Sequence, residues 1–136
     1  MTKFNALMPE LSVKDIDVSK NFYLDILGFV LEYERVEDKF AFISYGEAQI
    51  MLEQINGYWK TGNFAYPLGR GINFQIKTEH LDVLREKLVA NGYQLFRDIE
   101  EVNYRENRIV HKGKEFLVQD PDGYLLRFSQ LLCSIE

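Results

Sequence analysis

The sequence predicts an α+β fold built from two tandem βαβββ modules, and two observations predict it. Strand-like alternation and helix-like periodicity follow each other in the same order in both halves of the chain. A short segment also repeats nearly in register, with Ile16-Asp17-Val18 matched by Leu81-Asp82-Val83 and Leu27-Gly28-Phe29 matched by Asn91-Gly92-Tyr93. Neither half has enough core to stand alone. We therefore expect one curved mixed sheet with the helices on its outer face.

The first module covers about residues 4–54. Its expected elements are a strand, a helix and three further strands, at residues 6–13, 16–27, 29–36, 39–45 and 48–54. Asp15 is placed to cap the helix and Gly28 to end it. Helical spacing puts three apolar side chains on one stripe, Val18, Phe22 and Ile26.

The second module covers about residues 71–130 and repeats this order. Its expected elements lie at residues 71–78, 79–90, 94–102, 115–119 and 124–130. The helix has an apolar stripe of Leu81, Leu84 and Leu88, and Asn91-Gly92 ends it. The mixed charges of residues 97–108 are typical of a solvated, hairpin-like excursion.

A connector of about residues 55–70 joins the modules. It is rich in turn residues, yet it carries four aromatic residues, Tyr58, Trp59, Phe64 and Tyr66. A loop of this length is more often functional or a linker than idle. The whole chain of 136 residues is the size of one domain, so we expect residues 1–136 to form a single one.

Composition narrows the class of protein. The net charge is −5, from 21 acidic and 16 basic residues, and no basic stripe of the kind that binds nucleic acid is present. An acidic balance favours cationic ligands. The single cysteine, Cys133, excludes an internal disulfide and is expected to pack as a small apolar residue. No signal segment or membrane-spanning apolar run is evident, so we expect a cytoplasmic protein.

Strand alternation predicts a polar face opposite the helices. On the last strand, Tyr124, Leu126 and Phe128 are expected in the core, which leaves Leu125, Arg127 and Ser129 on the other side. The apolar sets expected against the helices on the first and fifth strands are Leu7, Leu11 and Val13, and Ile72, Phe74 and Ile76. The polar face is then made by residues such as Met8, Glu10, Met51, Glu53, Gly71 and Asn73. Alternation alone does not distinguish a cleft from a solvated surface.

Two motifs carry a resemblance to a known family. The first is V-K-D-x-D-x-S-x-x-F-Y-x-x-x-L-G-F, Val13 to Phe29, and the second is D-P-D-G-Y-L-L-R-F, Asp120 to Phe128. With the doubled βαβββ order, the chain resembles the vicinal oxygen chelate superfamily over essentially its whole length. That group includes glyoxalase I, extradiol dioxygenases, fosfomycin-resistance thiol transferases and bleomycin-resistance proteins, so the resemblance implies the glyoxalase/bleomycin-resistance fold.

The resemblance also implies where a metal would bind. Metal-dependent members carry ligands at four inward strand positions, which correspond here to Met8, Glu53, Gly71 and Arg127. Only Glu53 is a suitable donor, and an arginine repels a divalent cation. We therefore expect no metal, no cofactor and no catalytic residue of the usual family type.

The bleomycin-resistance branch is the most similar in pattern, through D-P-D-G-x-L-L-R and the Leu52-Glu53 pair. Those proteins are homodimers that bind the drug in clefts at the dimer interface without modifying it. The resemblance thus implies sequestration of a bleomycin-type glycopeptide or a similar cationic aromatic molecule, which confers antibiotic resistance. The residues expected to bind it are Trp59, Tyr58, Phe64, Phe40, Phe42, Glu53, Arg127, Met51 and Asn73.

Several alternatives stay open. Trp59 is equally suited to a dimer interface. Phe40 and Phe42 also suit the core or an interface, and Arg127 suits a structural ion pair with Glu53. The two histidines, His80 and His111, are expected to be solvated or to make local hydrogen bonds rather than to act in catalysis. The competing functions are a metal-dependent lyase, isomerase or dioxygenase using Glu10, Glu53 and His111, or a diverged domain with another ligand.

Overall fold

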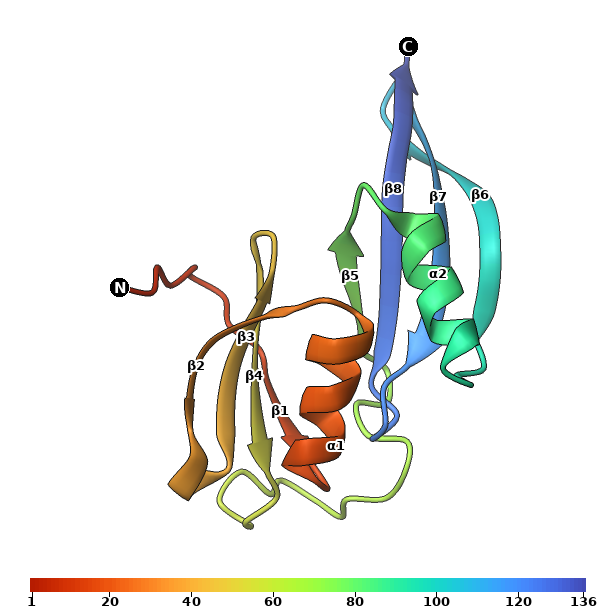
Figure 1. Ribbon diagram of the computed structural model, residues 1–136. Helices are drawn as coiled ribbons and strands as arrows, with labels where there is room; N and C mark the ends of the chain where they lie inside the picture. Colours follow the sequence, from red (N-terminus) through yellow and green to blue (C-terminus); the bar gives the residue numbers. More distant parts are fainter. The chain divides into compact units, whose positions relative to one another are not determined.

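The computed structural model describes all residues from 1 to 136, and they form two compact units, Met1–Leu68 and Gly69–Glu136. Each unit contains one four-stranded sheet and one helical segment that lies across a face of that sheet (Figure 1). The two βαβββ modules expected from the sequence are therefore present, and the α+β fold class is confirmed. The expected single curved sheet is wrong, because the strands of each module pair only with one another and form two separate four-stranded sheets.

The first unit has the strand order β1-β4-β3-β2. β1 pairs in parallel with β4, and the other neighbours are antiparallel. The elements in chain order are β1 (Glu10–Val13), α1 (Ile16–Lys20), the π-helical η1 (Asn21–Ile26), β2 (Val30–Arg35), the 3₁₀ turn η2 (Val36–Asp38), β3 (Phe40–Tyr45) and β4 (Ala48–Gln54).

The second unit repeats this topology with the strand order β5-β8-β7-β6. Its elements are β5 (Asn73–Lys77), α2 (Leu81–Ala90), β6 (Arg97–Glu106), β7 (Ile109–Gln119) and β8 (Leu125–Ile135). β5 pairs with β8 only as far as Lys77, which lies opposite Ser129, whereas β7 pairs with β8 as far as Ile135. The three longer strands therefore continue beyond the end of β5 (Figure 1).

Each core lies between the sheet and its helix. In the first unit the buried set includes Leu11, Val13, Ile50, Leu52, Phe22, Tyr23 and Ile26. In the second unit it includes Ile76, Phe116, Leu126, Phe128 and the predicted stripe Leu81, Leu84 and Leu88. Phe116 and Phe128 stack with their ring centroids 5.5 Å apart. These side chains make the helix-facing side of each sheet apolar, which leaves the opposite face for other roles.

Some expected core positions are wrong. Val18 is 48% exposed, because the helix turns Ile16, Ser19, Phe22 and Tyr23 inward and passes into the wider π-helical η1. Leu7 and Ile72 are exposed because β1 begins only at Glu10 and β5 only at Asn73, so neither residue belongs to an alternating strand.

The C-terminal half of the second unit also differs from expectation. Residues 97–108 lie in a solvated hairpin arm, as expected, in which β6 pairs with β7 apart from one register shift near Arg97. β8 runs to Ile135 instead of ending at 130, and Cys133 on this extension is exposed rather than packed. Neither helix is both long and apolar enough to cross a membrane.

Candidate ligand-binding site

The face of the first sheet opposite α1 gathers several of the residues expected at a site. Strand pairing sets Glu10 beside Met51 and Ser12 beside Glu53. On the next strand, Phe42 lies opposite Met51 and Phe40 opposite Glu53. Directly paired residues project from the same side of a sheet. Two carboxylates, a thioether and two aromatic rings therefore share one face, which we call the acidic face.

The rings of that face pack against one another and against the N-terminal segment. Tyr33 stacks on Phe42 with 5.3 Å between centroids and 8° between planes, and Phe4 meets Phe42 edge-on at 5.4 Å. The Arg35 guanidinium lies 4.1 Å from the centroid of the Phe40 ring. Both Phe40 and Phe42 are buried, which agrees with the alternative that they belong to the core. Contact between these rings and a ligand stays a prediction.

Three hydrogen bonds fix the segment that carries Phe4. The Asn5 backbone N–H donates to Oε1 of Gln49 at 2.7 Å, and the Asn5 side chain donates to the Glu47 carbonyl at 2.6 Å. The Gln49 side-chain amide in turn donates to the Lys3 carbonyl at 2.6 Å. These hydrogen bonds hold the N-terminal segment in the position from which Phe4 contacts Phe42.

Glu10 is the unusual group on the acidic face. Its Oε1 is buried and has no hydrogen-bond partner. Burial and the neighbouring Glu53 carboxylate raise the pKa of Glu10, although a hydrogen bond from Trp59 and the charge of Arg35 act in the opposite direction. Glu53 Oε1 accepts a 3.3 Å hydrogen bond from the Asn56 amide. The two carboxylates thus repel each other, and one acceptor is left unused.

The connector supplies exposed aromatic surface next to this pair. Tyr58 and Trp59 are 77% and 55% exposed and meet edge-to-face with centroids 4.7 Å apart. The Tyr58 backbone N–H donates to Oδ1 of Asn56 at 2.9 Å, which ties the aromatic pair to the partner of Glu53. Phe64 is half-buried farther along the connector.

A hollow of about 390 Å³ adjoins Glu53. It is lined by Glu37, Asp38, Lys39, Glu53, Gln54, Ile55 and Asn56. Asp38 is paired with Arg35 at 2.9 Å, so Glu37 and Glu53 are the carboxylates left without a cationic partner there. The hollow, the acidic face and the aromatic pair together suit a cation that carries a flat ring.

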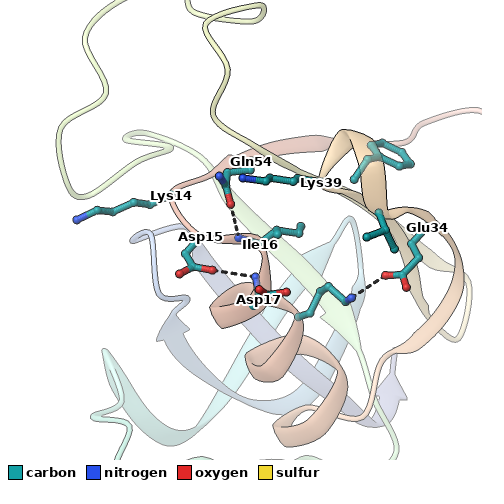
Figure 2. A pocket seen from close by; sticks show the side chains of 10 residues that line it. Lys14, Asp15, Ile16, Asp17, Glu34, Lys39 and Gln54 are labelled. Carbon is teal, nitrogen blue, oxygen red and sulfur yellow. Dashed lines mark hydrogen bonds and ion pairs between the residues drawn. The ribbon is translucent and has the colours of Figure 1, made fainter.

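A second hollow in the first unit, of about 420 Å³, lies at the start of α1 (Figure 2). Its polar groups mostly serve the local fold. Asp15 accepts from the Asp17 and Val18 backbone N–H groups, Gln54 accepts from the Ile16 N–H at 3.1 Å, and Lys20 is 2.6 Å from Glu34. We interpret it as the framework of the helix start and not as a ligand site.

Arg127 lies in a network of its own in the second unit. Nη1 donates to the Tyr104 hydroxyl at 3.2 Å and is 3.8 Å from Oε2 of Glu115. The Tyr104 hydroxyl lies 3.0 Å from both oxygens of Glu115, which is only 5% exposed. The Arg127 Nε is buried without a partner. The expected pair with Glu53 stays a prediction, and Asn73 is exposed at the start of β5.

Sequence reasoning missed Tyr104 and Glu115. Both fall in a region of mixed charge, and their meeting depends on the β6–β7 register, which pairs Glu100 with Glu115 and Tyr104 with His111. Only a prediction of that register could have found them.

The donors at the positions that the resemblance implies do not fit a divalent metal. Met8 offers a thioether, Gly71 has no side chain and sits at φ +84°, and Arg127 is a cation within its own network. His111 is engaged by Glu106 and Ser134, each at 2.8 Å. No three His, Cys, Asp or Glu side chains gather in a way that could hold a metal ion.

Comparison with known proteins gives relatives over nearly the full length. A probable lactoylglutathione lyase of Synechocystis sp. (strain ATCC 27184 / PCC 6803 / Kazusa) is 29% identical over 126 residues, covering 88% of this chain and 90% of the relative.

Two solved structures share the fold. TioX from Micromonospora sp. ML1 superposes with a TM-score of 0.71 at 16% identity, covering 95% of this chain and 100% of the other. A glyoxalase/bleomycin resistance protein/dioxygenase from Alicyclobacillus acidocaldarius gives a TM-score of 0.65 at 20% identity, over 95% and 92%.

The family comparison covers almost the whole chain. Residues 3–128 match the model of the Glyoxalase/Bleomycin resistance protein/Dioxygenase superfamily, which spans both modules and both motifs. With the doubled βαβββ topology, this match shows that the chain belongs to that superfamily.

Proposed function

We propose that the protein binds a cationic aromatic small molecule, of the bleomycin glycopeptide kind or similar, and sequesters it without chemical change. The observation that carries the proposal is the pair of Glu10 and Glu53, with a buried Glu10 oxygen that lacks a donor and Trp59 exposed beside it. A ligand ammonium or amidinium would supply that donor and relieve the repulsion between the carboxylates.

The aromatic part of the ligand would stack on the connector. Tyr58 and Trp59 offer ring faces to solvent, and a flat heteroaromatic ring gains from stacking and from exclusion of water. The proposal includes a single domain over residues 1–136 that works as a homodimer, with the binding cleft at the dimer interface. Such a ligand would be held by charge at one end and by ring contacts at the other, and resistance to it would follow from its removal from solution.

Fluorescence tests the proposal directly, because Trp59 is the only tryptophan. We expect bleomycin or a related glycopeptide to change the Trp59 emission at micromolar protein, and calorimetry to give the same affinity. Glu53→Gln should weaken binding by about tenfold, the size expected for one charge-assisted hydrogen bond. The matched control is Glu47→Gln, which removes the same charge from the exposed turn between β3 and β4. Equal affinity of the two variants, or no Trp59 response, would contradict the proposal.

The alternative is an enzyme of the same superfamily, favoured by the 29% identity to a probable lactoylglutathione lyase. It predicts that purified protein retains a stoichiometric divalent metal and forms lactoylglutathione from methylglyoxal and glutathione. Metal analysis and an assay of that product, with and without chelator, decide between the two functions. Activity that is lost with the chelator and restored by metal would replace the sequestration proposal.

A further inference from the structure

A hollow of about 400 Å³ lies in the second unit, at the place where β5 ends and the longer strands continue. Its walls come from β5, β6, β7 and β8, and they include Lys77, Val102, Tyr104, His111, Ser129 and Leu131. This size is within the range of small-molecule sites in proteins. The hollow is formed by the second unit alone, and Leu131 lies outside the residues that match the family.

Part of the lining of the hollow is apolar or bare backbone. A Cβ on Gly113 would lie 2.7 Å from the Gln130 carbonyl oxygen, so this position on β7 has to be glycine and presents bare backbone. Val102 lies opposite Gly113 on β6, and Leu131 lies opposite it on β8. The Leu131 side chain is 58% exposed, although it lines the hollow. A planar apolar body would remove this surface from water.

The charges around the hollow leave one cation without a partner. Lys114 is paired with Asp82 at 2.7 Å, and Arg127 is engaged by Tyr104 and Glu115. The carboxylates of Glu115 and Glu106 are likewise engaged, since Glu115 accepts from Tyr104 and Glu106 bonds to His111. Lys77 lines the same hollow with no ion pair.

The geometry points to a second binding site here, for an organic carboxylate with a flat apolar body, and we propose that Lys77 pairs with the carboxylate. The apolar body would lie over Gly113 between Val102 and Leu131, and Gln75 and Ser129 would contribute polar contacts near the charge. All the residues of this site belong to the second unit, and its preference in charge is opposite to that of the acidic face.

The experiment titrates ¹⁵N-labelled protein with 2-naphthoate and, in parallel, with neutral 2-naphthamide. We expect saturable shifts of the backbone amides near Gly113 and Leu131 with naphthoate, and much weaker binding of the amide. Lys77→Gln should weaken naphthoate by about tenfold, as expected for loss of a charge-assisted contact. Lys87→Gln removes the same charge from the exposed end of α2 and should leave the affinity unchanged.

Three results would overturn this inference: equal binding of naphthoate and naphthamide, equal affinity of the Lys77→Gln and Lys87→Gln proteins, or shifts centred away from β7 and β8. Leu131→Ser gives a second test, because an exposed side chain on a strand can be changed without disturbing the core. It should weaken both probes. Unchanged affinity in that variant also counts against the site.

Discussion

Replacing Arg127 by methionine leaves Glu115 as a nearly buried carboxylate with only the Tyr104 hydroxyl to support it. At the observed 3.8 Å, two unit charges attract by about 4 kcal/mol at an effective dielectric constant near 20. The Arg127 side chain is 26% exposed, so water screens part of this attraction. We therefore expect a coupling free energy of about 1–2 kcal/mol between Arg127 and Glu115.

A double-mutant cycle measures that coupling. The free energy of unfolding in urea is determined for Arg127→Met, Glu115→Gln and the double variant. Arg127→Met alone should lower the free energy of unfolding by about 2–3 kcal/mol, because it leaves the buried Glu115 carboxylate without its ion-pair partner. Adding Glu115→Gln to this variant should recover part of that loss. A coupling below about 0.5 kcal/mol, the usual limit of additivity, would refute the reasoning. The same cycle with Glu53→Gln tests the pair that was expected from the sequence.

Three further predictions follow from the described contacts. The raised pKa of Glu10 means that the folded protein binds a proton at this carboxyl more tightly than the unfolded chain does. The free energy of unfolding should therefore fall as pH rises from 4.5 through the raised pKa, and Glu10→Gln should remove this fall. An unchanged pH profile in the variant would be contrary evidence. The hydrogen bond from Arg85 lowers the pKa of Asp98 to about 2, so carboxyl NMR should show Asp98 ionised at pH 3, and Arg85→Gln should move its midpoint toward 3.8. Leu88→Ala empties a fully buried position and should cost about 2–5 kcal/mol in urea unfolding, whereas Val89→Ala at the adjacent exposed position should change stability by less than about 0.5 kcal/mol.

The sequence predicts the module order and most of the core because these depend on local pattern. Leu81, Leu84 and Leu88 repeat at helical spacing and are buried as expected, and Gly28 and Gly92 take the positive φ that ends each helical segment. The acidic face also follows from alternation, because β4 was placed at its true bounds, residues 48–54.

The remaining features depend on contacts that no local pattern encodes. Val18 fits a regular helix but not the π-helical continuation that the chain adopts. Cys133 was expected to pack because its neighbours are apolar, whereas the tail is a paired strand whose side chains face solvent. The partners of Arg127 follow from the register of β6, β7 and β8, and a register shift lies in each of these two pairings.

The end of β8 has a consequence for the behaviour of the protein in concentrated solution. Within its sheet, the segment from Gln130 to Ile135 pairs only with β7, so its other edge presents unpaired backbone groups. The segment carries Leu131, Leu132 and Ile135 exposed, with no proline and no charge to discourage another strand. It is therefore the place in this unit most open to edge-to-edge aggregation. Leu132→Lys should reduce this aggregation, because a charge on an edge strand disfavours the addition of a further strand.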